Sequence, residues 1–110
     1  MKLLKLFLAV SLSLLFSSTL FAQEEPKYDI EKLSDKIYKF TVVQNGFPVA
    51  VIASIGDDGI LLVDTGQADA AENLKKTIQS IDNRIPSYII STHSHADHIG
   101  GNLMFGADPI

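Results

Sequence analysis

The side chains that could carry out chemistry are concentrated between Thr92 and Asn102, which reads Thr-His-Ser-His-Ala-Asp-His-Ile-Gly-Gly-Asn. This stretch holds all three histidines of the 110-residue chain, with one aspartate among them. Zinc takes imidazole nitrogens and carboxylate oxygens as ligands, usually in a tetrahedron, and a catalytic zinc leaves one position to water or substrate. The pattern therefore predicts a metal site formed by His93, His95, Asp97 and His98.

The spacing of these residues predicts which of them can bind the same metal ion. If the preceding strand stays extended through His93 and His95, both side chains point to the same side and can bind one ion. Asp97 and His98 are adjacent, so we place them where the backbone begins to turn and expect them to face a second ion or another side of the first. The following Gly100–Gly101 pair suits that turn, because glycine accepts positive φ and lets other backbone approach closely.

The motif resembles the HxHxDH signature of the metallo-β-lactamase superfamily, and the Val-Asp-Thr-Gly sequence at residues 63–66 resembles its earlier aspartate motif. The resemblance covers roughly residues 37–102. It implies an α/β fold in which the chain forms the N-terminal half of a four-layer αβ/βα sandwich, incomplete here. We therefore expect residues 23–110 to be the N-terminal part of a longer domain that continues after Ile110. The 110-residue chain alone is then expected to be inactive.

The same resemblance implies a metal-dependent hydrolase. In the dinuclear members His93 and His95 would bind a first metal, and Asp97 and His98 a second, so Asp97 is assigned to catalysis as well as to metal binding. Two Zn²⁺ ions about 3.5 to 4 Å apart can activate a metal-bound hydroxide. The hydroxide would attack a carbonyl-type bond such as a β-lactam, lactone or thioester. The missing ligands, a further histidine, a bridging aspartate and a last histidine, would follow Ile110.

Asp64 is the remaining candidate residue. As a structural residue it would cap the turn that it forms with Thr65 and Gly66. The resemblance instead implies that Asp64 lies beneath the histidine loop and orients it by hydrogen bonding, and both roles can hold together. Loss of such an orienting partner typically weakens metal binding about 10- to 100-fold.

Other functions fit the same motif. Iron-containing sulfur dioxygenases of the superfamily carry a related sequence, so a mononuclear iron site is one alternative, and iron or manganese could replace zinc. A second alternative is a noncatalytic extracytoplasmic domain that binds metal for structure or sequestration. Closed structural zinc sites generally use thiolates, however, and the chain has no cysteine. A binding module with incidental histidines is the third alternative.

The first 22 residues have the pattern of a signal peptide. Lys2 and Lys5 make the start positive, residues 6–16 form an apolar stretch, and small and polar residues lead to Ala22, after which we expect cleavage. An uncleaved anchor is the alternative, because residues 3–21 are nearly long enough to span a bilayer. The pattern predicts a periplasmic or secreted protein with no stable membrane association after cleavage.

The mature domain, residues 23–110, is small and acidic. Without the two N-terminal lysines it has seven basic and 13 acidic residues, which gives a net charge of −6. Nucleic-acid surfaces need clustered Lys and Arg, so we expect a small-molecule substrate and no nucleic-acid partner. With no cysteine the chain tolerates an oxidising compartment but forms no disulfide of its own.

Hydrophobic patterns predict the elements that position the motif. Strands are expected at residues 28–33, 37–43, 49–55, 60–63 and 87–91. Asn45–Gly46 is the strongest short signal for a type I′ hairpin, and Gly56–Gly59 forms a second turn in which Asp57 and Asp58 are solvated. The continuous apolar run at residues 60–63 is typical of a strand buried on both faces.

Between residues 68 and 81 apolar residues recur every three or four positions, which predicts an amphipathic helix with Asp69 and Glu72 as a capping pair. A strand, helix and strand of this length imply that residues 60–63 and 88–91 pair in parallel. Both strands then end at the same edge of the sheet, where open α/β folds bind their ligands. We therefore expect Asp64 and His93 to lie together at that edge.

Overall fold

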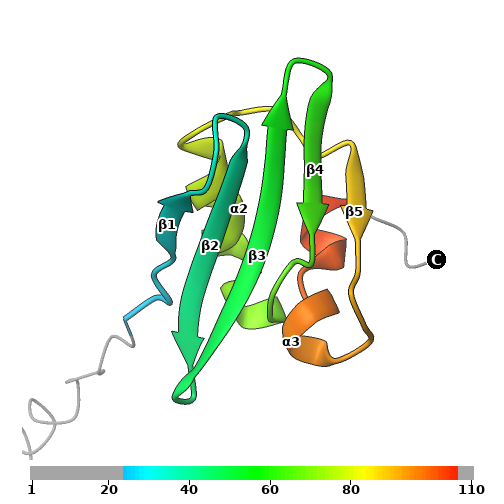
Figure 1. Ribbon diagram of the computed structural model, residues 1–110. Coiled ribbons are helices and arrows are strands. Elements are labelled where there is room, and N and C mark those ends of the chain that lie inside the picture. The colour runs from blue at the N-terminus through cyan, green and yellow to red at the C-terminus, as the bar shows by residue number, and fades with distance from the viewer. Residues whose placement is uncertain (1–23, 107–110) are drawn as a thin grey trace, which may run out of the picture.

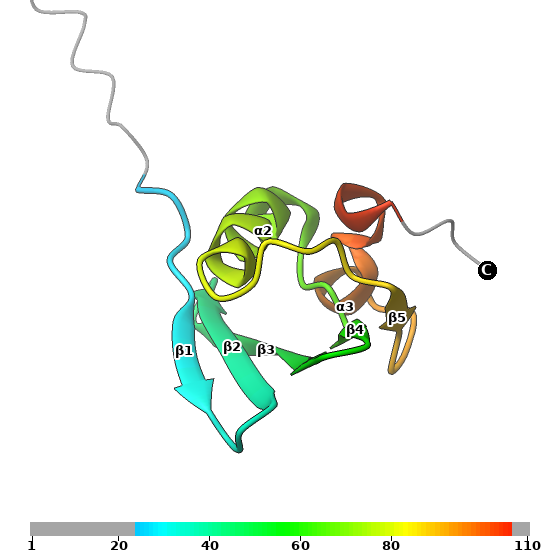
Figure 2. The same cartoon turned by 90° about the horizontal axis from the view of Figure 1, so that it is seen from above.

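The computed structural model describes residues 24–106, which form one mixed sheet with the helices on one of its faces (Figures 1 and 2). The strands follow each other in the sheet in sequence order: β1 (Asp29–Lys32), β2 (Ile37–Gln44), β3 (Phe47–Gly56), β4 (Gly59–Val63) and β5 (Tyr88–Ile90). The helices are the 3₁₀ helix η1 (Ala68–Ala70), α2 (Ala71–Gln79), α3 (Ala96–Ile99) and the 3₁₀ helix η2 (Asn102–Phe105). The predicted signal peptide, residues 1–22, lies outside the described residues. None of the helices between residues 24 and 106 is long and apolar enough to cross a bilayer.

The first four strands form an antiparallel meander joined by tight turns. The β2–β3 turn has Asn45 at φ 51° and Gly46 at φ 82°, and these two positive values confirm the predicted type I′ hairpin. The β3–β4 turn leaves Asp57 and Asp58 exposed, as expected of solvated turn residues. Arg84 supports this second turn, because its guanidinium donates to the Gly56 carbonyl at 2.6 Å.

The last strand pairs in parallel with β4, as the strand–helix–strand pattern predicts. The register aligns Leu61 with Tyr88 and Val63 with Ile90. The pairing continues one step past both strands, since the Asp64 N–H donates to the Ile90 carbonyl at 2.8 Å. Figure 1 shows β4 and β5 running in the same direction, with α3 beside the ends of both. We call this the carboxyl edge of the sheet.

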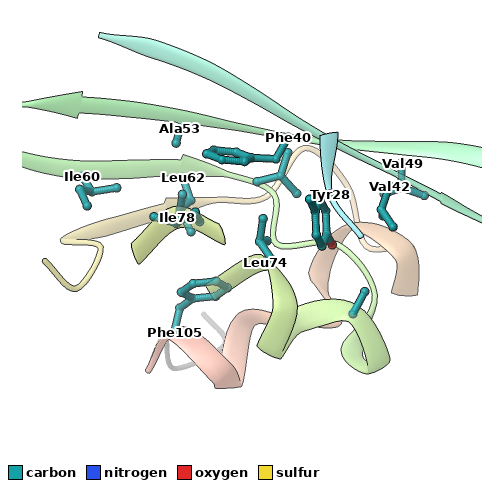
Figure 3. Packing of buried hydrophobic residues seen from close by; sticks show 12 residues of the cluster. Tyr28, Phe40, Val42, Val49, Ala53, Ile60, Leu62, Leu74, Ile78 and Phe105 are labelled. Atoms are coloured by element: carbon teal, nitrogen blue, oxygen red, sulfur yellow. The ribbon is translucent and has the colours of Figure 1, made fainter. Parts of the chain in front are cut away.

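The core lies between the helix-covered face of the sheet and α2, as Figure 3 shows. Phe40 and Leu62 contribute fully buried side chains from the sheet, and Leu74 and Ile78 contribute them from α2. The three- and four-residue recurrence in α2 therefore forms its buried face, which confirms that the helix is amphipathic. The remaining buried apolar residues of this cluster are Tyr28, Val42, Val49, Val51, Ala53, Ile60, Ala70 and Phe105.

Two details of the predicted helix are wrong. The segment begins as the 3₁₀ helix η1 and becomes α-helical only from Ala71 to Gln79, so it is shorter than the predicted range of residues 68–81. Asp69 and Glu72 form no capping pair, because neither helix start has a side-chain cap hydrogen bond. Asp69 instead accepts a hydrogen bond from the Gln44 side chain at 3.1 Å, which ties η1 to the end of β2.

The prediction that residues 60–63 are buried on both faces is also wrong. Ile60 and Leu62 are buried beneath the helices, but Leu61 and Val63 point to the opposite face and are only half-buried. The helices between residues 24 and 106 cover a single face of the sheet, so alternate side chains of β4 differ in burial (Figure 2).

Tyr28 carries a polar group into the core. Its side chain is only 5% exposed, and its hydroxyl finds no hydrogen-bond partner among residues 24–106. Burial, together with the negative charge of Asp69, raises the pKa of Tyr28 from 10.0 to about 12. The hydroxyl lies directly beneath Gly66, where a Cβ would come within 2.9 Å of it.

Replacing Tyr28 with phenylalanine should therefore stabilise the protein. Removing a buried hydroxyl without a partner is expected to raise the free energy of unfolding by up to about 1 kcal/mol at neutral pH. Because the folded state favours the protonated phenol, the wild-type protein should also lose stability as the pH rises from 10 towards 12, and Tyr28→Phe should lose less. Denaturant unfolding of both proteins at pH 7 and across this alkaline range measures the difference. A less stable phenylalanine variant at neutral pH would contradict the prediction.

Candidate metal centre

The histidine motif lies in a loop at the carboxyl edge and continues into α3. The prediction that β5 stays extended through His93 and His95 is wrong, because the strand ends at Ile90 and a bend follows. The two rings nevertheless meet: His93 Nε2 lies 3.1 Å from His95 Nδ1. His95 has extended backbone immediately before α3, and this residue directs the chain from the loop into the helix.

Asp97 and His98 lie in the first turn of α3, which confirms that the backbone turns at this point. His98 Nε2 lies 3.4 Å from the Asp97 carboxylate. The His93 and His98 ring centroids are 4.1 Å apart, so the imidazoles form one group at the carboxyl edge. The structure therefore places all four predicted ligands at this edge, in contact as the pairs His93–His95 and Asp97–His98.

The separations within each donor pair fit metal binding. Two donor atoms held about 2.0 to 2.1 Å from one tetrahedral zinc lie about 3.3 Å from each other. The His93–His95 nitrogens at 3.1 Å and the His98–Asp97 atoms at 3.4 Å are close to this value. Between residues 24 and 106 no three such side chains converge as one ion-binding group. The donors thus meet as two pairs, as the spacing predicts, with two donors in each.

Asp64 lies beneath this loop, as the resemblance implies. The residue is 4% exposed, and Oδ2 lies 2.8 Å from His98 Nδ1. The Thr92 backbone N–H donates to Oδ1 at 2.8 Å, and the Thr92 hydroxyl lies 2.8 Å from Oδ2. A carboxylate can only accept hydrogen bonds, so His98 must carry its ring proton on Nδ1. In the neutral form of His98, Nε2, the atom nearer Asp97, is then the nitrogen without a proton.

The contacts of Asp64 keep it ionised. Burial raises the pKa of the Asp64 carboxyl, but hydrogen bonds from the Thr92 backbone, His98 and the Thr92 hydroxyl together hold that pKa below its ordinary value of 3.8. Asp64 also has a positive φ of 65°. This conformation costs an L-residue about 1 to 2 kcal/mol, and aspartate is among the residues that tolerate it. This backbone conformation directs the Asp64 carboxylate from the end of β4 towards the loop.

Backbone hydrogen bonds join residues 64–66 to α3. The Thr65 N–H donates to the His98 carbonyl at 2.8 Å, and the Gly101 N–H donates to the Gly66 carbonyl at 3.2 Å. The Thr65 hydroxyl, fully buried, donates to Asn102 Oδ1 at 2.6 Å. These contacts fix the orientation of α3, and therefore of the Asp97 and His98 side chains.

The double glycine works by close approach. Gly100 and Gly101 have φ values of −60° and −87°, so the expectation that positive φ explains them is wrong. A Cβ on Gly101 would lie 2.4 Å from the Thr65 carbonyl oxygen, and one on Gly100 would lie 2.6 Å from the Ala68 nitrogen. Glycine is needed because the turn after α3 packs directly on the backbone that follows β4.

Sequence reasoning missed Thr92, Thr65 and Asn102. A signal for Thr92 was present, because parallel pairing of β4 and β5 places the residues that follow the two strands side by side. Thr65 and Asn102 are 37 positions apart, and no spacing rule connects them.

The structure is thus an α/β arrangement with imidazole and carboxylate side chains gathered at the carboxyl edge of a mixed sheet. The sequence model of the metallo-beta-lactamase superfamily matches residues 45–107, more than half of the chain. The chain therefore belongs to the metallo-β-lactamase superfamily.

Solved structures show the same fold. A metallo-β-lactamase from Pontibacter korlensis is 24% identical with a TM-score of 0.64, and the match covers 74% of this chain and 41% of that one. MIM-1 from Novosphingobium pentaromativorans is 25% identical with a TM-score of 0.61, covering 83% and 35%. MEM-A1, a subclass B3 metallo-β-lactamase from a soil metagenome library, is 19% identical with a TM-score of 0.63, covering 76% and 32%. This chain thus spans between 32% and 41% of their lengths and forms part of their fold.

Gly101→Ala should destabilise the protein and weaken its metal site. The added methyl group meets backbone that cannot rotate away, so we expect a loss of about 3 kcal/mol in the free energy of unfolding. Gly106→Ala is the control, because it has a φ of 71° but nothing within 4 Å of the new Cβ. It should cost only about 1 kcal/mol. Denaturant unfolding measures both, and equal losses would contradict the steric explanation.

Proposed function

We propose that the protein is a metal-dependent hydrolase whose centre holds two zinc ions and cleaves a carbonyl-type bond such as a β-lactam, lactone or thioester. One observation carries this proposal: His93 with His95, and Asp97 with His98, meet as two donor pairs at separations suited to metal ions. Three imidazoles and a carboxylate are ligands that suit zinc.

The comparisons support the proposal. The similar structures are metallo-β-lactamases, and one of them, LRA-12 from an Alaskan soil metagenome, is a class B3 di-zinc enzyme with 19% identity and a TM-score of 0.60. A catalytic zinc takes three protein ligands, whereas residues 24–106 offer two to each ion. We propose that the remaining donors come from outside this range, since the chain spans about two fifths or less of the length of these enzymes.

The ions, when bound, would polarise the carbonyl and lower the pKa of a water molecule towards neutrality. The residues of this chain would hold the ions and orient the side chains that bind them. His93 and His95 would hold one ion, Asp97 and His98 the other, and Asp64 keeps His98 turned with Nε2 free. Asp97 would also place negative charge at the reacting centre. No serine nucleophile is required, and Ser94, exposed between the histidines, is a loop residue.

We further propose that the protein acts on a small molecule in the periplasm or outside the cell, after removal of residues 1–22. The proposal rests on the signal-peptide pattern in the sequence. Zymography of the culture medium and of periplasmic extracts, with cytoplasm as the control, tests the location.

His95→Ala in the full-length protein should abolish metal binding at the first pair and hydrolysis with it. Loss of a residue that merely orients a ligand costs about 10- to 100-fold in affinity, so loss of the ligand itself should exceed 100-fold. Metal analysis after dialysis, followed by turnover assays on a β-lactam, a lactone and a thioester, measures both effects. Ser94→Ala is the matched control and should retain metal and turnover.

The same measurements separate the alternatives. Bound zinc without turnover on any of the three substrates would favour a noncatalytic metal-binding domain. A single iron per chain would favour the dioxygenase alternative. Full hydrolysis by metal-free His95→Ala would exclude the proposed chemistry.

A further inference from the structure

We infer that Thr92 is a positioning residue that fixes the ring proton of His93 on Nδ1, so that Nε2 is the nitrogen free to bind metal. The inference rests on the proposed metal centre and deepens it. The relevant contacts form a chain from the buried Asp64 carboxylate, through the Thr92 hydroxyl, to the His93 ring.

The first step concerns the hydroxyl proton of Thr92. Its Oγ1 lies 2.8 Å from Asp64 Oδ2 and 3.1 Å from Asp64 Oδ1. Both carboxylate oxygens accept hydrogen bonds and neither donates one, whereas a hydroxyl has a single proton to give. Two oxygens at this distance with no proton between them would repel each other, so the Thr92 proton must point to Asp64.

The second step concerns the ring proton of His93. Thr92 Oγ1 also lies 2.9 Å from His93 Nδ1. Because its proton is already directed at Asp64, the hydroxyl can only accept from the imidazole. His93 must therefore donate from Nδ1, and its Nε2 is left with a lone pair. That nitrogen is the one that faces His95 at 3.1 Å.

One carboxylate thus sets the ring protons of two histidines by different routes. Asp64 acts on His98 directly, at 2.8 Å, and on His93 through Thr92. His95 differs, since the contact that its ring makes within residues 24–106 is to His93 Nε2. If that nitrogen accepts, His95 Nδ1 donates to it in the metal-free protein. The exposed His95 ring must then exchange this proton with water before Nδ1 can bind metal.

The ring protons are tested in the full-length protein stripped of metal. Long-range ¹H–¹⁵N correlation spectra distinguish the two neutral forms of imidazole from each other and from the doubly protonated ring. In the wild-type protein and in Thr92→Ser, both His93 and His98 should carry the proton on Nδ1. In Thr92→Val, His93 should move towards the Nε2-protonated form while His98 keeps its proton on Nδ1. His93→Gln and His98→Gln assign the signals.

Zinc competition titrations on the same proteins provide a second measurement. Thr92→Val should bind zinc roughly 10- to 100-fold more weakly than the wild-type protein, and Thr92→Ser should restore most of the affinity. Thr77→Val is the matched control, because it removes a threonine hydroxyl that donates at 2.7 Å to the Asn73 carbonyl on α2, away from the site. It should change neither the ring protons nor the affinity.

The outcomes separate this inference from the proposed function. If Thr92→Val keeps the Nδ1 proton on His93, or binds zinc as tightly as the wild-type protein, the role of Thr92 is overturned while the metal centre stands. If the wild-type protein binds no zinc, the proposed function fails, and the metal-free spectra still decide whether Thr92 sets the His93 proton.

Discussion

The buried Asp64 carboxylate is the interaction on which the site depends. It accepts hydrogen bonds from Thr92, which follows β5, and from His98, which lies in α3, so it joins the two segments that carry the predicted ligands. Asp64 reaches both because β4 and β5 pair in parallel and end together. Hydrogen bonds to a charged group contribute about 1.5 to 3 kcal/mol each, enough to offset the strain of the positive φ at Asp64. The connection through α2 makes β4 and β5 parallel, so it positions the site as well as contributing to the core.

The backbone around Asp64 must be close to α3 for these contacts to form. The Thr65 N–H donates to the His98 carbonyl and the Gly66 carbonyl accepts from the Gly101 N–H, so residues 64–66 hold the C-terminal end of the short helix. A four-residue helix has little stability of its own, because nucleating a helix is unfavourable. Packing against residues 64–66 provides the stability that α3 lacks on its own. Hydrogen bonds therefore hold the loop of predicted ligands where it meets the sheet.

The sequence was sufficient for the parts of this arrangement that follow from local rules. Asn45–Gly46 specified a hairpin through positive φ, and the crossover length specified parallel β4 and β5. The failures arose where tertiary contacts decide. Asp69 bonds to Gln44 instead of capping its helix, and Gly101 is needed for its missing Cβ, not for its φ. His93 and His95 meet through a bend, a geometry that alternation along a strand does not describe, and the hydroxyl direction at Thr92 depends on Asp64 alone.

The donor pairs share an asymmetry that follows from these contacts. In each pair one side chain is held by a contact that leads to Asp64: His93 through Thr92, and His98 directly. The other side chain contacts its own pair partner, His95 the His93 ring and Asp97 the His98 ring. A held donor reduces the entropy lost when an ion binds, since its ring is already oriented. Both held rings, those of His93 and His98, depend on Asp64, which is 4% exposed, so the fold around the end of β4 sets their orientation.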